Sequence, residues 1–164
     1  MTLDAVCQAV ETSGLGRGID SSPVLWPTIE TIHLAAMVVL VGTVSFFDLR
    51  LLGLAVTHLP VSRIAARVLP WSRAAFGIMI LTGSLLFASE AQRKYCFNPA
   101  FRIKLMLLLL AGVNVLIFEF TAFRRVSRWD ASAPPLGARL AGAISILLWG
   151  GVIIAGRWIG FAVG

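Results

Sequence analysis

The sequence predicts an all-α membrane protein, with four antiparallel transmembrane helices preceded by a short amphipathic surface helix. Hydrophobic residues make up 58% of the 164-residue chain and charged residues only 13%, against about 50% and about 25% in an ordinary soluble domain. Four apolar segments are each long enough to cross about 30 Å of hydrocarbon. Charged residues gather mostly between these segments, as in the loops of a membrane protein.

This composition excludes several classes of protein. So few charges cannot cover the surface of a soluble globule of this size, and so apolar a chain does not stay disordered. The net charge of +6 is shared by many nucleic-acid-binding proteins, but the sequence contains no nucleic-acid motif and no basic-aromatic stripe. We therefore expect the basic residues to meet anionic lipid headgroups, and we expect no nucleic-acid partner.

Residues 1–26 are expected to form a surface segment ahead of the bundle. Apolar residues at helical spacing are followed by three glycines: Leu3, Val6 and Val10, then Gly14, Gly16 and Gly18. This pattern predicts a short surface helix followed by a loop. No apolar core of a cleavable signal peptide precedes the first span, so we expect that span to act as its own insertion signal.

Residues 27–164 are expected to form the bundle, and short connections make successive spans antiparallel. The predicted spans cover residues 28–54, 71–88, 100–123 and 136–161. A proline stands near the start of each span, where its missing N–H costs nothing: Pro27, Pro70, Pro99 and Pro135. Four tryptophans fall near the predicted membrane interfaces: Trp26, Trp71, Trp129 and Trp158.

The distribution of Lys and Arg predicts the orientation. Eight basic residues flank the first and third connections: Arg50, Arg63, Arg67, Arg73, Arg124, Arg125, Arg128 and Arg139. Six flank the opposite side: Arg17, Arg93, Lys94, Arg102, Lys104 and Arg157. The positive-inside rule then places both termini outside. Cys7 and Cys96 would both lie on that outer side, where they either form a disulfide or remain two thiols.

Ionisable side chains inside a membrane are costly, which makes them candidates for function. One group lies toward the outer face, with members from all four spans: Glu30, His33, Glu90, Arg102, Lys104 and Arg157. Glu30 and His33 are three residues apart and share a helix face. Pairing with Glu30 and Glu90 would account for Lys104 and Arg157. It leaves His33 as the residue that charge pairing explains least.

His33 is the candidate ligand of a cofactor, with haem b, a quinone and Cu(I) all open. The other histidine, His58, would lie about 37 Å away along a continuous helix. Haem would therefore need a methionine, or a histidine from another protomer, as its second ligand. Cu(I) would use His33 and Met37, which are one turn apart on one face, and Met79 and Met106 could add thioethers. Methionines in membrane helices also serve as packing residues.

A second charged group lies toward the inner face: Asp48, Arg50, Arg73, Glu119 and Arg139. We expect structural ion pairs here, with Asp48 bound to Arg73 or Arg139. Polar groups within the spans, such as Thr82 and Asn114, are expected to bond to backbone carbonyls or across the bundle. The sequence contains no nucleophile–base pair, phosphate loop, zinc motif or CxxC pair, which favours a non-catalytic role.

Several runs of residues carry a resemblance: Ile32-His33, Asp48-Leu49-Arg50-Leu51-Leu52-Gly53, Asn98-Pro99-Ala100-Phe101-Arg102-Ile103-Lys104 and Gly156-Arg157-Trp158. After about residue 24, nearly the whole chain resembles a family of small bacterial membrane proteins that is known as a domain of unknown function. The resemblance implies a four-helix bacterial inner-membrane protein, and it implies no activity. A looser, fold-level likeness extends to copper-resistance and cytochrome-b-like membrane bundles.

Three functions remain open at this point. The leading hypothesis is a non-catalytic subunit of an electron-transfer system in the bacterial inner membrane, with both termini periplasmic and the group around His33 as its working site. It would act beside other membrane or periplasmic subunits, or as a homo-oligomer. The alternatives are a small copper or proton-linked transporter, which would have to be oligomeric, and a purely structural membrane anchor.

Overall fold

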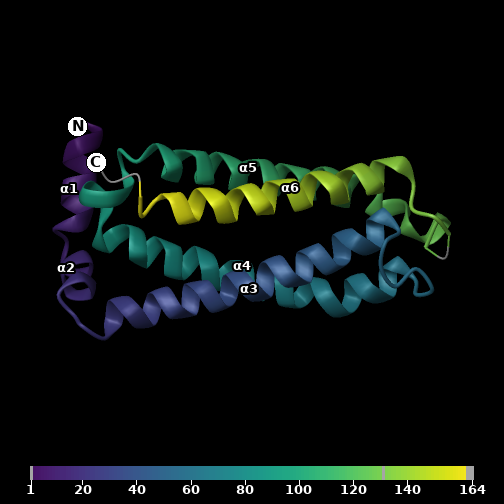
Figure 1. The fold of residues 1–164 in the computed structure, drawn as a ribbon, viewed down its shortest axis with the longest axis horizontal. Coiled ribbons are helices and arrows are strands. Elements are labelled where there is room, and N and C mark those ends of the chain that lie inside the picture. The colour runs from purple at the N-terminus through teal and green to yellow at the C-terminus, as the bar shows by residue number, and fades with distance from the viewer. Residues whose placement is uncertain (1, 131, 162–164) are drawn as a thin grey trace.

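The structure is a computed structural model that describes residues 2–130 and 132–161. Over these residues the chain forms six α-helices and two shorter helical turns (Figure 1). The first two helices are short, α1 (Leu3–Glu11) and α2 (Gly14–Asp20). Four long helices follow: α3 (Leu25–Leu52), α4 (Val61–Ser89), α5 (Pro99–Phe120) and α6 (Leu136–Trp158). The π-helical turn η1 (Ala91–Tyr95) links α4 to α5, and the 3-10 turn η2 (Phe123–Arg128) follows α5.

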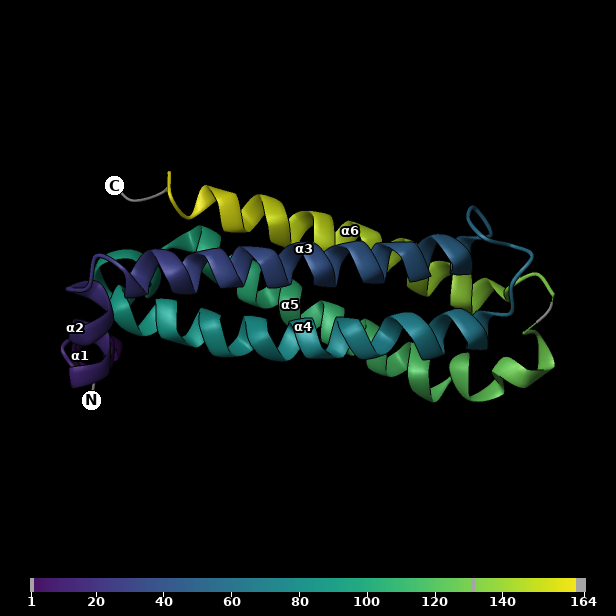
Figure 2. The ribbon, with the colours of Figure 1, turned by 90° about the horizontal axis from the view of Figure 1, so that it is seen from below.

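The four long helices run antiparallel as two pairs, which confirms the predicted all-α bundle (Figures 1 and 2). Helix α3 packs along α4, α5 packs along α6, and α6 joins the pairs by packing on α3. Side chains of α4 and α5 also meet. Phe87 stacks on Phe101, with ring centroids 5.6 Å apart, and Arg73 Nη2 lies 2.8 Å from Glu119 Oε1.

The two ends of the bundle differ in what covers them. At one end α1 and α2 lie across the helix ends, next to η1 (Figure 1). We call this the disulfide end, because Cys7 of α1 is bonded to Cys96 there. The opposite, arginine-rich end carries exposed cations around the α3–α4 and α5–α6 connections: Arg63, Arg67, Arg124, Arg125, Arg128 and Arg139.

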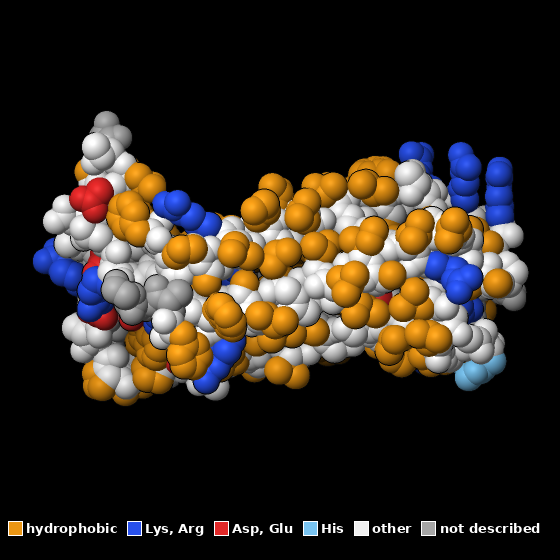
Figure 3. Space-filling view, turned by 45° about the horizontal axis from the view of Figure 1, so that its top comes forward, with side chains coloured by type: hydrophobic (Ala, Val, Ile, Leu, Met, Phe, Trp, Pro, Cys, Tyr) orange, Lys and Arg blue, Asp and Glu red, His pale blue; other side chains and the backbone are white. Residues whose placement is uncertain are grey.

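An apolar belt lies between these ends. Figure 3 shows hydrophobic side chains over the middle of the bundle, and Lys and Arg side chains toward both ends. Large apolar side chains of α3, α5 and α6 point outward, with Val38 at 70%, Leu109 at 68% and Leu147 at 75% exposure. All four long helices are long and apolar enough to cross a membrane, with mean hydropathy between 1.4 and 2.1. Such a surface is stable in lipid rather than in water, and the chain is a multi-pass membrane protein.

The N-terminal segment differs from the predicted helix and loop, because the glycine-rich stretch is itself helical. Ser13 caps α2 by accepting a hydrogen bond from the backbone N–H of Gly16 at 3.1 Å. A Cβ on Gly16 would come within 2.6 Å of the Ala88 carbonyl oxygen. This glycine is therefore a packing position that lets α2 approach the end of α4, and it does not break the helix.

Helix α4 begins at Val61, well before the predicted start of the second span at residue 71. Pro70 lies inside this helix, where it removes one backbone hydrogen bond. Trp71 follows it and is exposed, which suits a position at the lipid interface. Trp129 is not such an anchor, because it is buried in the arginine-rich end and donates from Nε1 to the Ala122 carbonyl.

Candidate functional site

A cavity of about 800 Å³ opens among the four long helices toward the disulfide end. We call it the histidine cavity. Most of its wall is aliphatic or aromatic, and its polar groups come from α3, α4, η1, α5 and α6. The polar and sulfur-bearing residues that line it are Glu30, His33, Met37, Met79, Ser84, Lys94, Tyr95, Lys104 and Arg157. Three of the predicted outer residues and His33 thus share one cavity, whereas Glu90 and Arg102 stand outside it.

His33 is held in one orientation by Thr82 of α4. The His33 Nδ1 lies 2.8 Å from Thr82 Oγ1, and the Thr82 hydroxyl lies 2.7 Å from the Ile78 carbonyl oxygen. A hydroxyl has a single proton, and this geometry directs it to the carbonyl, so His33 Nδ1–H is the donor to Thr82. In neutral His33 the other nitrogen, Nε2, then carries a lone pair. Among the described residues Nε2 makes no hydrogen bond, which leaves it free for a ligand.

Gly83 makes room for the imidazole. A Cβ at this position would lie 3.2 Å from His33 Cε1 and 3.7 Å from Nδ1. Any side chain would therefore press on the ring and on its hydrogen bond to Thr82. We call the adjacent residues Thr82 and Gly83 the seat of His33. They meet His33 only when α4 is aligned along α3 as it is here.

Lys104 lies on α5, close enough to His33 for the two groups to interact electrostatically. Its side chain packs over Gly156 of α6, where a Cβ would meet Nζ at 3.7 Å. Neither Lys104 nor Glu30 forms an ion pair with another described residue. The ammonium is half-buried without a carboxylate, so it needs an acceptor within the cavity.

The predicted pairing of the outer charges is therefore wrong for Glu90. Its carboxylate binds Lys94 of η1, with Nζ 2.9 Å from Oε2, and does not reach Lys104 or Arg157. Lys94 was absent from the predicted pairing, although it is only four residues after Glu90 in the sequence. The π-helical turn η1 places it at the cavity wall. Arg157 is exposed and lies over the ring of Phe161, with 5.1 Å between Cζ and the ring centroid. Within the part of the chain that the structure describes, the cavity charges without an ion pair are Glu30, Lys104 and Arg157.

Three aromatic rings close the disulfide end of the cavity. Phe87 stacks on Phe101, and Tyr95 lies 5.1 Å from Phe101 between ring centroids. Burial, together with the nearby carboxylates of Glu90 and Glu30, raises the pKa of the Tyr95 hydroxyl above its usual range. Tyr95 was not among the predicted site residues, and its one signal in the sequence is a lone tyrosine beside basic residues.

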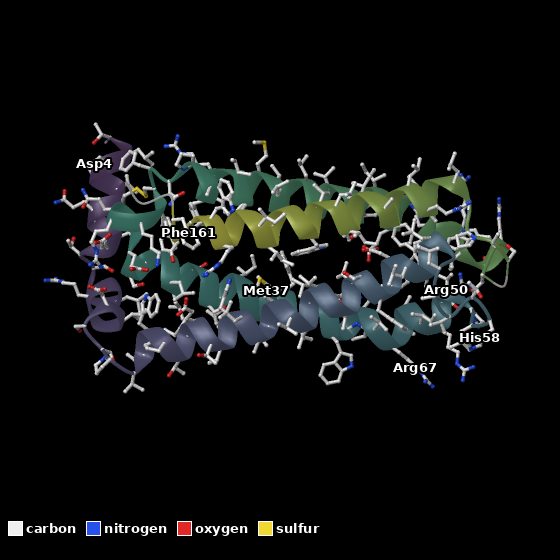
Figure 4. The ribbon with its side chains drawn as sticks, viewed as in Figure 1. Asp4, Met37, Arg50, His58, Arg67 and Phe161 are labelled. Atoms are coloured by element: carbon white, nitrogen blue, oxygen red, sulfur yellow. A yellow bond between two sulfur atoms is a disulfide. The ribbon has the colours of Figure 1, made fainter. Side chains whose placement is uncertain are left out.

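Figure 4 places Met37 on the inner side of α3, facing the space between the helix pairs. Met37 and Met79 both line the histidine cavity, and Met79 is also buried in the core beside Trp149. Met106 is 59% exposed and does not line the cavity, so it is no ligand there. Over the described residues no group of three or more His, Cys, Asp or Glu side chains could hold a metal ion.

The first two helices cap this end of the bundle. The Cys7–Cys96 disulfide ties α1 to the segment after η1. Arg93 of η1 adds two ion pairs, to Glu11 at 2.6 Å and to Asp20 at 2.8 Å. Since η1 also provides Lys94 and Tyr95, the cap and one wall of the histidine cavity are a single connected unit.

A second cavity of about 440 Å³ lies toward the arginine-rich end, and we call it the aspartate cavity. The predicted ion pairs of Asp48 are absent here, because Arg73 binds Glu119 and Arg139 makes no ion pair among the described residues. Asp48 Oδ2 is buried without a hydrogen-bond partner. Arg50 also forms no ion pair, and its Nε and Nη2 both donate to the Leu59 carbonyl, at 3.0 and 2.8 Å. Trp149, Phe76 and Leu108 line both cavities.

Comparison with known proteins identifies the family. No curated protein and no solved structure matches the chain. The model of a family described as being of unknown function, DUF6644, matches residues 8–162. This match includes the four long helices, both cavities and Cys96, and it begins one residue after Cys7. The chain belongs to this family of unknown function.

Proposed function

We propose that this protein is a non-catalytic subunit of an electron-transfer system in the bacterial inner membrane, and that it holds a quinone in the histidine cavity. The observation that carries the proposal is that two polar groups without a partner among the described residues, His33 Nε2 and the Lys104 ammonium, face one mostly apolar cavity. A quinone presents polar oxygens on an apolar ring and tail. It therefore matches both the wall and the two polar groups.

Each polar group has a distinct task toward such a ligand. The lone pair of His33 Nε2 accepts a hydrogen bond from the hydroxyl of a reduced quinone. The Lys104 ammonium donates to a carbonyl oxygen of the oxidised form, and its charge stabilises negative charge on the head group. Thr82 and Gly83 hold the imidazole, so that the ligand does not have to order it on binding.

The charge of the cavity favours this ligand over a metal cation. Among residues 2–130 and 132–161, the cations Lys104 and Arg157 and the anion Glu30 line the wall without an ion pair. A cuprous ion at His33 would be repelled by Lys104 in a poorly solvated site. A head group with oxygen acceptors is attracted by the same charge.

Binding of Cu(I) is the second candidate, because His33, Met37 and Met79 line the same cavity. One imidazole and two thioethers are a suitable ligand set for Cu(I). Both methionines lie about one helical turn from the His33–Thr82 pair, on the side toward the arginine-rich end. Neither methionine could then bind a haem iron on the side opposite His33, so haem would need its second ligand from another protein or protomer.

The proposed orientation places the disulfide end in the periplasm. A disulfide is stable in an oxidising compartment, which supports an outer location for Cys7 and Cys96. The exposed arginines of the opposite end support a cytoplasmic location for that end. Partner subunits or further copies of the chain would contact the exposed helix faces.

The test is to purify the protein from its native membrane in mild detergent and to measure quinone, copper and the visible spectrum together. We expect about one quinone per chain, and most of it should be lost in the His33→Ala and Lys104→Met variants. Matched controls are His58→Ala, which removes the exposed histidine of the arginine-rich end, and Arg102→Met, which removes an exposed cation of α5 outside the cavity. Both controls should retain quinone.

Other results would refute the proposal. A Soret band would identify haem as the ligand. About one copper per chain, lost in His33→Ala and in Met37→Ala, would establish the second candidate. Equal quinone content in the wild type and in His33→Ala would remove His33 from the site, and absence of all three ligands would favour the structural anchor.

A further inference from the structure

The aspartate cavity contains a buried carboxylate that the proposed function does not use. Asp48 is only 4% exposed, and its Oδ2 has no hydrogen-bond partner among the described residues. Ser145 lies beside the carboxylate, and no arginine reaches it. A buried carboxylate oxygen without a partner is costly, so it marks a place where a positively charged or hydrogen-bond-donating ligand would be stabilised.

The balance of charge in this cavity is opposite to that of the histidine cavity. Its charged lining residues are Asp48, Arg73 and Glu119. Arg73 is bound to Glu119 at 2.8 Å, so these two largely cancel. The carboxylate of Asp48 remains as the single uncompensated charge, and it attracts cations.

The rest of the wall is apolar and rich in aromatic rings. Five rings line it, contributed by α3, α4, α5, η2 and α6: Phe47, Phe76, Phe118, Phe123 and Trp149. The face of an aromatic ring attracts a cation, most of all where water is excluded. Asn114 adds little as a donor, because its Nδ2 is already bound to the Ala141 carbonyl at 3.0 Å.

These features distinguish between kinds of cation. A metal ion such as Ca²⁺ or Mg²⁺ needs about six or more oxygen ligands, and this wall offers few. An organic cation with an apolar body needs one counter-ion and an apolar, aromatic cavity of a few hundred Å³. We propose that the aspartate cavity binds a lipophilic organic cation of drug-like size, with Asp48 as its counter-ion and the aromatic rings around its body.

The experiment uses the full chain in detergent and benzyltrimethylammonium as the probe. Its neutral isostere, neopentylbenzene, has carbon in place of the charged nitrogen and otherwise the same shape. Equilibrium dialysis against matched micelles corrects for partition into detergent. We expect the wild type to prefer the cation over the isostere by about tenfold or more, since the carboxylate and the rings favour charge.

Asp48→Asn keeps the size of the side chain and removes its charge, and it should abolish that preference. The control is Glu30→Gln, the same carboxyl-to-amide change in the histidine cavity, and it should leave the preference intact. Equal affinity of the wild type for cation and isostere would overturn the proposal, as would an unchanged preference in Asp48→Asn. If Asp48→Asn fails to fold, the wild-type comparison still decides. Quinone content reports on the other cavity, so the two proposals can fail independently.

Discussion

The seat of His33 makes a prediction that does not depend on which ligand the cavity binds. Thr82→Val keeps the shape of the side chain and removes the hydroxyl that accepts from His33 Nδ1–H. A neutral hydrogen bond contributes about 1 kcal/mol, which is about fivefold in an equilibrium. We therefore expect the equilibrium between the two tautomers of His33 to move toward Nε2–H by about fivefold in the variant, because Nδ1–H loses its acceptor.

Nitrogen-15 NMR of protein labelled only at histidine measures this shift. The chain has two histidines, and His58 is exposed at the arginine-rich end (Figure 4), so it is an internal reference. At about pH 8, above the ordinary pKa of imidazole, the chemical shifts of the two ring nitrogens report which one carries the proton. The wild type should show His33 protonated at Nδ1.

Thr82→Ser restores a hydroxyl and should restore the wild-type signal. The control is Thr43→Val, because Thr43 bonds to backbone carbonyls and to Ser72, away from His33. If a quinone is bound, its affinity should fall by about fivefold in Thr82→Val and stay within about twofold in Thr82→Ser. Identical His33 signals in the wild type and Thr82→Val would refute the assigned role of Thr82.

Three further predictions concern other parts of the chain. Arg50→Met should lower the free energy of unfolding by about 2–4 kcal/mol, since the partly buried Leu59 carbonyl loses a charged donor. Arg67→Met, at an exposed arginine of the same end (Figure 4), should change it by less than about 0.5 kcal/mol, and denaturation in detergent compares the two variants. The single tyrosine, Tyr95, should ionise only above the usual pKa of about 10, because burial favours its neutral form. The stability that it contributes is complete below that value and is lost as the pH rises through the raised pKa, which ultraviolet titration tests. Cys7→Ser should speed proteolysis between α1 and α3 while leaving the bundle intact, and equal cleavage rates with and without the bond would contradict the tie between cap and bundle.

The bundle could be predicted because it follows from composition and length alone. In lipid, the backbone N–H and C=O groups of four long apolar runs can form their hydrogen bonds only if each run is a helix. Short connections then make successive helices antiparallel. The group around His33 was also predictable in outline. Depth in the membrane follows from distance to the helix ends, so Glu30, His33, Lys104 and Arg157 were expected at one level, and all four line one cavity.

The partners of individual side chains could not be predicted in the same way. Which residues meet depends on the rotation and the axial offset of each helix, and neither is encoded in a single span. Asp48 illustrates this, because several arginines lie at a similar depth and yet Arg73 turns to Glu119. Thr82 was expected to bond to a backbone carbonyl, and it does so, but its second bond to His33 requires the α3–α4 alignment.

Local rules failed where packing overrode them. Three alternating glycines normally disfavour a helix, but α2 forms because Ser13 caps it and Gly16 fits against α4. Pro70 lies within α4 because the helix extends beyond the apolar run, through a segment whose arginines are exposed. In such a segment, the ends of the apolar run do not mark the ends of the helix.

The two cavities follow from one feature of the packing. Helix α6 lies on α3 and joins the helix pairs, so Trp149 of α6 fills the centre of the bundle and lines both cavities. On either side of it, polar side chains line the space that the apolar core does not fill. The unpaired cations then stand toward the disulfide end and the unpaired carboxylate of Asp48 toward the arginine-rich end. Opposite local charges on the two sides of one tryptophan are difficult to explain as packing devices alone, and they are what two sites for ligands of different charge require.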